Sequence, residues 1–109
     1  MCSSFPKVAG VTFGSRQAAL KRIGERYSPD DVAVTLRYEP DNQYDRNAVA
    51  VDVSVNGSKA YRLGYLPREW AEFVAGIMDA GVALTARLRG ITGGYGEKLN
   101  CGALVEIQL

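Results

Sequence analysis

Polar and aromatic side chains are concentrated in one segment of the chain, EPDNQYDRNAVAV, residues 39–51. Within it, Asn42, Tyr44 and Asp45 fall inside four consecutive positions. Asparagine and aspartate often form turns, because their side chains bond the nearby backbone. That role explains Asn42 and Asp45 but not the tyrosine between them. An aromatic face beside a carboxylate and amides suits a planar, hydrogen-bonding ligand such as a nucleobase with its sugar.

Catalytic and metal-binding chemistry has little support elsewhere in the sequence. The chain has no histidine, the commonest general base, and no Cys-x-x-Cys pair for zinc. Glu39, Asp41 and Asp45 lack the regular spacing of a calcium loop. No motif indicates a nucleophilic serine, a phosphate loop or a dinucleotide site. We therefore expect no metal and no cofactor, and an enzyme is only the third hypothesis for function.

A glycine-rich segment, ITGGYGEKLN, is predicted to form a loop between two strands over residues 91–100. Its backbone N–H groups could hold a phosphate, but glycines between strands more often only make the turn. The loop also contains Tyr95. An exposed aromatic ring on such a loop is a natural surface for base stacking.

Charge is unevenly distributed although the net charge is only +1. Residues 16–26 carry four basic side chains and one acidic one, whereas residues 30–52 carry six acidic and two basic ones. Basic residues return at Lys59, Arg62 and Arg68 and again at Arg87 and Arg89. A basic face for nucleic acid is compatible with this pattern, although mixed charge can also serve solubility alone.

A chain of 109 residues with 47% hydrophobic residues is expected to form one globular domain. We expect a flexible tail over residues 1–7 and a single domain over residues 8–109. No apolar run approaches the roughly 18 residues of a membrane span, and the first ten residues lack a signal-peptide pattern, so a cytoplasmic location is expected. Cys101 occupies an apolar strand position and is expected to be a core thiol, and nothing supports a disulfide with Cys2.

Alternating apolar and polar residues predict about six strands. An Asn-Gly pair at residues 56–57 marks a hairpin. Tyr38 and Tyr61 lie on apolar strand faces and are expected in the core, whereas Tyr65 fits either the core or a binding site. The expected strands cover residues 8–13, 32–39, 49–55, 61–65, 82–89 and 99–109.

Two helices are predicted, over residues 17–26 and from residue 67 to residue 80. Ser15 is suited to cap the first helix and Gly24 to end it. Pro67 suits the first turn of the second helix, and Gly81 its end. The second helix carries an apolar stripe that is expected to face the core: Trp70, Phe73, Val74, Ile77 and Met78. Many short strands with two helices predict a mainly β fold, a small antiparallel sheet or partly closed barrel with helices covering its ends.

Four segments, in this order along the chain, together resemble the HIRAN domain family: VAGVTF, EPDNQYDRNAVAV, RLGYLPREWAEFVAGIMDAG and ITGG. The most specific part is N-x-Y-D-x-N-A-V-x-V followed by L-G-Y-L-P. Gln43 departs from the pattern, since family members usually have proline there. Because it has no helicase motif, the sequence resembles the stand-alone bacterial and phage members.

The resemblance implies a small OB-like barrel that binds single-stranded DNA at its 3′-hydroxyl end, with DNA repair or replication proteins as further partners. Thr12 stands where well-studied members have a basic residue, and Arg16 is the candidate replacement. Tyr95 corresponds to an aromatic residue in the glycine-rich loop of some relatives. Carried over by position, the other implied DNA-binding residues are Phe13, Asn42, Tyr44, Asp45, Tyr65 and Arg68.

These residue types suggest distinct roles at a DNA end. Phe13 and Tyr44 would stack on the last bases. Arg68, with Lys59, Arg62 or Arg16 nearby, would hold phosphates. Asp45 would accept a hydrogen bond from the terminal 3′-hydroxyl group. The alternative from another class is a protein-interaction domain that uses the same groove for a peptide or a partner protein.

Overall fold

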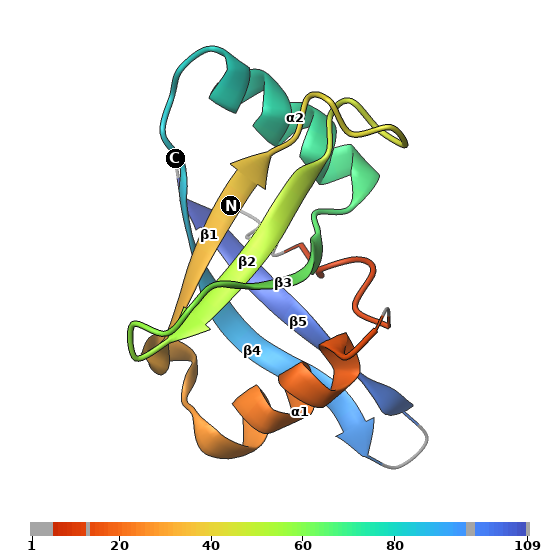
Figure 1. Cartoon of the computed structure of the whole chain (residues 1–109), viewed down its shortest axis with the longest axis vertical. Helices are drawn as coiled ribbons and strands as arrows, with labels where there is room; N and C mark the ends of the chain where they lie inside the picture. Colours follow the sequence, from red (N-terminus) through yellow and green to blue (C-terminus); the bar gives the residue numbers. More distant parts are fainter. Residues whose placement is uncertain (1–5, 13, 96–97, 109) are drawn as a thin grey trace, which may run out of the picture.

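The structure is a computed structural model that describes residues 6–12, 14–95 and 98–108, without the side chains of residues 94–95 and 98–100. Five antiparallel strands form one sheet in the order β3-β2-β1-β4-β5 (Figure 1). The strands are β1 Val32–Tyr38, β2 Val49–Val55, β3 Tyr61–Tyr65, β4 Thr85–Tyr95 and β5 Lys98–Gln108, and the helices are α1 Arg16–Arg26, the short η1 Pro29–Asp31 and α2 Arg68–Asp79. The prediction of a mainly β, barrel-like fold with two helices is confirmed.

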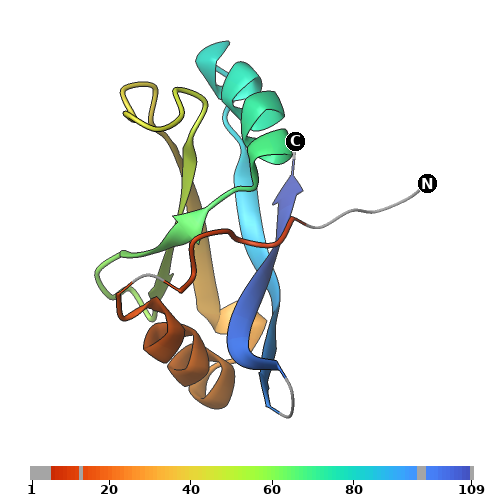
Figure 2. The same ribbon diagram turned by 90° about the vertical axis from the view of Figure 1, so that its right-hand side faces the viewer.

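The first residues of the described chain join the two edges of this sheet. The N–H group of Val8 donates to the Ala103 carbonyl of β5 at 2.9 Å, and Ala9 exchanges backbone hydrogen bonds with Tyr65 of β3. Figure 2 shows this segment crossing from β5 to β3. The segment thereby bridges the edges of the curled sheet into a partly closed barrel, which leaves neither edge strand fully unpaired.

This closing segment corrects the predicted first strand over residues 8–13. Only isolated bridges form, at Lys7 and Ala9. Gly10 has a φ of 76°, and the chain turns at residues 11–12 instead of extending along a neighbour. Pro6 and Lys7, which the predicted tail included, bond or bridge to β5, and residues 1–5 lie outside the described residues.

A bulge in the pairing of β2 with β3 decides which side chains reach the outer face. The register shifts between Val51 and Asp52, so Arg62 pairs with Asp52 while Tyr65 pairs with Ala50. Because one extra residue reverses the alternation of side chains, Arg62 and Tyr65 share a face although they are three residues apart. The strand pattern alone placed Tyr65 on the same face as the core residue Leu63.

The helices lie at opposite ends of the barrel, as predicted (Figure 1). The first helix, α1, buries Leu20 and Ile23. The prediction that Gly24 ends it was wrong, because the helix continues to Arg26 and caps at Tyr27. Gly24 faces Ile91 of β4, where a Cβ would make an ordinary contact at 3.6 Å.

The second helix is rotated from the predicted orientation. It buries Ala71, Val74 and Ala75, whereas Phe73 of the predicted stripe is 56% exposed. Small alanine side chains let the helix backbone approach the barrel, which turns the bulkier residues outward. Trp70 and Met78 pack against the core at its margin.

The predicted glycine-rich loop is largely strand. β4 and β5 pair through it as far as Tyr95 and Lys98, with a register shift between Gly93 and Tyr95. Gly93 has a φ of 74°, which allows the ladder to bulge and continue rather than stop. The predicted loop over residues 91–100 was therefore wrong in its extent.

Several smaller predictions can be compared with the structure directly. Cys101 is a buried free thiol, as predicted, and Cys2 lies outside the described residues. Tyr38 and Tyr61 pack against the core. The hydroxyl of Ser15 lies 2.7 Å from the Tyr61 hydroxyl and makes no bond to the helix that it precedes. Within the described ranges, no helix is long and apolar enough to cross a membrane.

Candidate nucleic-acid interface

Asn42 shapes the loop between β1 and β2 from within. Its Oδ1 accepts hydrogen bonds from the backbone N–H groups of Tyr44 and Asp45, at 2.9 and 3.1 Å. Its Nδ2 donates to Oε1 of Glu39 at 3.1 Å. The amide is thus engaged at both ends inside the protein. It fixes the direction of the two residues that follow.

Asp45 and Tyr44 project from this fixed loop in different states of exposure. Oδ1 of Asp45 accepts from the backbone N–H of Asn47 at 2.9 Å, and the residue is partly buried. Tyr44 is 85% exposed. A tyrosine this exposed on a hydrogen-bonded loop leaves its ring open for a ligand to stack on.

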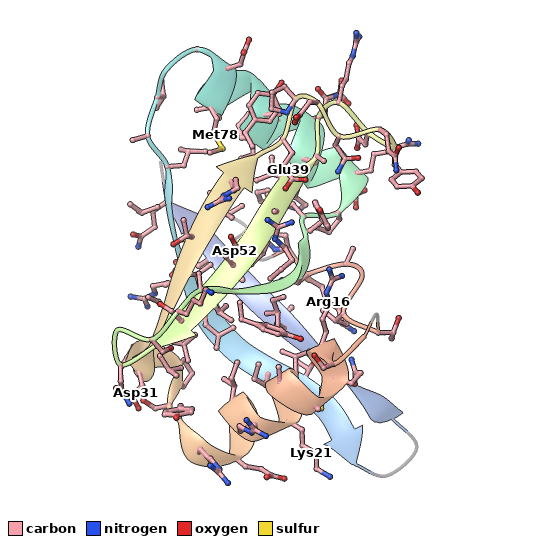
Figure 3. All side chains as sticks on the ribbon, in the orientation of Figure 1. Arg16, Lys21, Asp31, Glu39, Asp52 and Met78 are labelled. Carbon is pink, nitrogen blue, oxygen red and sulfur yellow. The ribbon has the colours of Figure 1, made fainter. Side chains whose placement is uncertain are left out.

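A polar cluster anchors the loop to the barrel. Oε1 of Glu39 accepts from the Tyr65 hydroxyl at 3.1 Å, and its Oε2 lies 3.1 Å from Nη1 of Arg62. The same Nη1 donates to the Tyr65 hydroxyl at 3.0 Å, and Nε of Arg62 donates to the buried Asp52 at 2.6 Å. Figure 3 shows Glu39 and Asp52 at two levels of this outer face. The cluster therefore connects the loop to β2 and β3 through charged hydrogen bonds.

The cluster shifts the proton affinities of two of its members. Burial alone would raise the pKa of Glu39, but hydrogen bonds from Asn42 and Tyr65 and the charge of Arg62 hold it below its ordinary value. Burial would likewise lower the pKa of Arg62, but its bond to Asp52 and the nearby negative charge raise it. Both groups are therefore charged near neutral pH.

A prediction for acid stability follows from Glu39. A carboxyl group with a lowered folded pKa stabilises the protein above its unfolded pKa, about 4.3, and this contribution disappears as the pH falls through the folded value. The free energy of unfolding should therefore decrease below about pH 4. In urea unfolding, the free energy of unfolding of Glu39→Gln should decrease less steeply than that of the wild type from about pH 5 to about pH 3. An unchanged slope would contradict this role.

The loop forms one wall of a cleft of about 640 Å³. The other walls come from the closing segment, the beginning of α1, the end of β3 and the beginning of α2. Arg16 projects from α1 into this region, where its Nη1 donates to the Gly10 carbonyl at 2.7 Å (Figure 3). The described residues that line the cleft are Gly10, Arg16, Asn42, Gln43, Tyr44, Asp45, Ala48, Tyr65, Leu66 and Arg68.

Six of the eight residues predicted from the sequence thus meet in this cleft: Arg16, Asn42, Tyr44, Asp45, Tyr65 and Arg68. Phe13 lies outside the described residues, as does the side chain of Tyr95. Among the described residues, two arginines and one aspartate line the cleft, so its lining is net basic. Arg68 is exposed at the first position of α2, and no carboxylate of the described chain pairs with it.

Sequence reasoning missed part of the cleft and its support. Leu66 and Ala48, both buried, contribute an apolar lining. The Leu-Pro end of the L-G-Y-L-P motif was the available signal for Leu66. Arg62, suggested as a phosphate ligand, pairs instead with Glu39 and Asp52. No local pattern links these residues, because they come from different strands.

A small, partly closed barrel with a basic, aromatic cleft at one side has the architecture of an OB-like ligand-binding module. The family comparison gives this class a name. Residues 7–109 match the family model of the HIRAN domain, so the chain belongs to the HIRAN family of DNA-binding domains.

Individual relatives agree with this assignment. The helicase-like transcription factor of the rabbit, Oryctolagus cuniculus, is 37% identical over 81 residues, which cover 71% of this chain and 8% of that protein. The crystal structure of the HIRAN domain of human HLTF has a TM-score of 0.54 and 21% identity, covering 96% of this chain and 73% of the other. A crystal structure from Lactobacillus plantarum has a TM-score of 0.58 and 22% identity, covering 96% and 92%. These two structures show a shared fold.

Proposed function

We propose that this chain binds single-stranded DNA without chemical turnover and prefers an end that carries a free 3′-hydroxyl group. The observation that carries the proposal is the cleft of a HIRAN-family barrel, in which an exposed tyrosine adjoins a carboxylate and two arginines. Partner proteins from DNA repair or replication and a cytoplasmic location stay predictions.

Each side chain of the cleft has a role set by its chemistry. Tyr44 stacks on a terminal base without reading its identity, because every base has a π face. Arg68 and Arg16 attract the neighbouring phosphates, which makes affinity depend on salt. Asn42 and Tyr65 hold the loop and the cleft wall in place through the Glu39 cluster. Binding thus uses a preformed site.

Asp45 supplies the discrimination between strand ends. A terminal 3′-hydroxyl group is a hydrogen-bond donor, and an ionised carboxylate accepts from it strongly. An internal nucleotide or a 3′-phosphate would bring a negative charge against the same carboxylate. That repulsion disfavours the wrong ligand and explains an acid within a basic cleft.

A direct titration tests whether the chain binds DNA at all. A short single strand labelled at its 5′ end should raise the fluorescence anisotropy in a saturable way, and the affinity should decrease as salt is added. The strand should have the same length on a denaturing gel after incubation. Absence of binding at low salt would overturn the proposal, and retained binding of a partner protein would then favour the interaction-domain alternative. Shortening of the strand by pure protein would contradict the non-catalytic role.

The aspartate can be tested separately with Asp45→Asn. Asparagine keeps an oxygen for the Asn47 N–H group but removes the negative charge. Because a hydrogen bond to a charged group contributes about 1.5–3 kcal/mol, the preference for a 3′-hydroxyl over a 3′-phosphate end should decrease about tenfold or more. Competition titrations of the two strands measure this ratio. A ratio equal to that of the wild type would remove Asp45 from end recognition.

A further inference from the structure

Two smaller hollows continue the cleft along the surface between α1 and β3. The first, of about 290 Å³, is lined by Gly14, Ser15, Arg16, Tyr61 and Arg62, and it shares Arg16 with the cleft. The second, of about 350 Å³, shares Ser15 and Tyr61 with the first. Shared lining residues place the three spaces next to one another along the surface, and we call the two smaller hollows the α1–β3 track.

The far part of this track is basic on both sides. Arg22 of α1 and Lys59, just before β3, line the second hollow and are exposed. Neither pairs with a carboxylate of the described residues, and no described acid lines either hollow. Arg62 lines the first hollow, but its charge is already engaged by Glu39 and Asp52. Arg22 and Lys59 therefore supply positive charge at the far end of the track, beyond Arg16, which the track shares with the cleft.

Aromatic and hydroxyl groups accompany these cations. Tyr61 stands at the junction of the two hollows, with its hydroxyl 2.7 Å from that of Ser15, and Tyr27 lines the far one. Grooves for single-stranded nucleic acid combine backbone-tracking cations with aromatic side chains. The hollow on the other side of α1 differs, because its Lys21 is accompanied by Glu25.

We propose that the α1–β3 track carries the nucleotides that precede the 3′ end, with Arg22 and Lys59 holding their phosphates. This inference rests on the proposed function, because the end of the strand must occupy the cleft. The strand would then leave the cleft past Arg16, pass Tyr61 and reach the Arg22–Lys59 pair. Longer strands should consequently bind more tightly than a strand that fills only the cleft.

Comparing short and long DNA strands distinguishes binding in the track from binding in the cleft. Anisotropy titrations would use 3′-hydroxyl strands of about three and about nine nucleotides, a range within the usual site sizes of such barrels. The wild type should bind the longer strand at least about fivefold more tightly at low salt. In the double variant Arg22→Ala with Lys59→Ala, binding of the short strand should stay the same while this gain disappears. The salt slope for the longer strand should decrease by about 1.4, the value for two single-strand phosphate contacts.

Two controls complete the experiment. Lys21→Ala removes one positive charge from the same helix outside the track and should keep the gain. The conservative pair Arg22→Lys with Lys59→Arg should restore it. Equal binding of both lengths by the wild type, or a full gain in the double alanine variant, would overturn the track and leave the end-binding proposal standing. Failure of both strands to bind would overturn the two proposals together.

Discussion

Replacing Tyr44 by alanine is expected to weaken binding of every single strand by about 5- to 150-fold. Stacking of one base on an aromatic side chain contributes about 1–3 kcal/mol, and each 1.4 kcal/mol is tenfold in affinity. Because the ring is 85% exposed, its removal should leave the free energy of unfolding nearly unchanged. The loss should be similar for strands that differ in their terminal base. Anisotropy titrations together with urea unfolding measure both quantities.

Phe73 provides a matched control for this substitution. It is an exposed aromatic residue on α2, outside the residues that line the cleft. Phe73→Ala should therefore bind DNA as the wild type does, and Tyr44→Phe should keep most of the affinity. Wild-type affinity in Tyr44→Ala would show that the loop is not the stacking surface.

Gly64→Ala is expected to produce the largest loss of stability among single-methyl changes in the barrel. A Cβ at Gly64 would overlap the Ala9 carbonyl oxygen and the Val8 side chain. Those atoms belong to the segment that closes the barrel through Ala9 and Tyr65. Overpacking of this kind costs about 1–3 kcal/mol, and loss of the two backbone hydrogen bonds would add to it. Urea unfolding measures the decrease.

Gly76→Ala is the matched control, since a Cβ there meets no atom within 4 Å. Gly76 lies inside α2, so alanine should raise the free energy of unfolding by about 0.5–1 kcal/mol. Equal stability of Gly64→Ala and the wild type would mean that the closing segment is not needed to hold the barrel.

The strands β1, β2 and β3 were predictable because their sequence signals are local. The alternation over β1 and the Asn56-Gly57 turn, with φ values of 50° and 73°, are as predicted, whereas β2 is buried on both faces from Val49 to Val53. Barrel closure was not predictable, because it depends on single bridges between distant segments. The β2–β3 bulge was not predictable either, because it depends on the register between two strands. The face on which Tyr65 lies follows from this bulge and was therefore not predictable.

The sequence predicted which residues belong to the candidate site, but not which contacts each side chain makes there. Residue types and the family pattern indicated Asn42, Tyr44 and Asp45. The turn-forming bonds of Asn42 to the loop backbone are as predicted, but the bond from its Nδ2 to Glu39 was not. The Glu39–Arg62 ion pair was not predicted either, since pairing across strands depends on register.

The central claim is that the cleft distinguishes where a strand stops, and one competition experiment tests it most directly. A labelled strand with a free 3′-hydroxyl end is bound to the wild-type protein and then displaced by three unlabelled competitors of equal sequence. These are the same strand, its 3′-phosphorylated form and its circular form. We predict that the 3′-hydroxyl strand competes at least about tenfold better than the other two. Equal competition by all three would contradict end recognition.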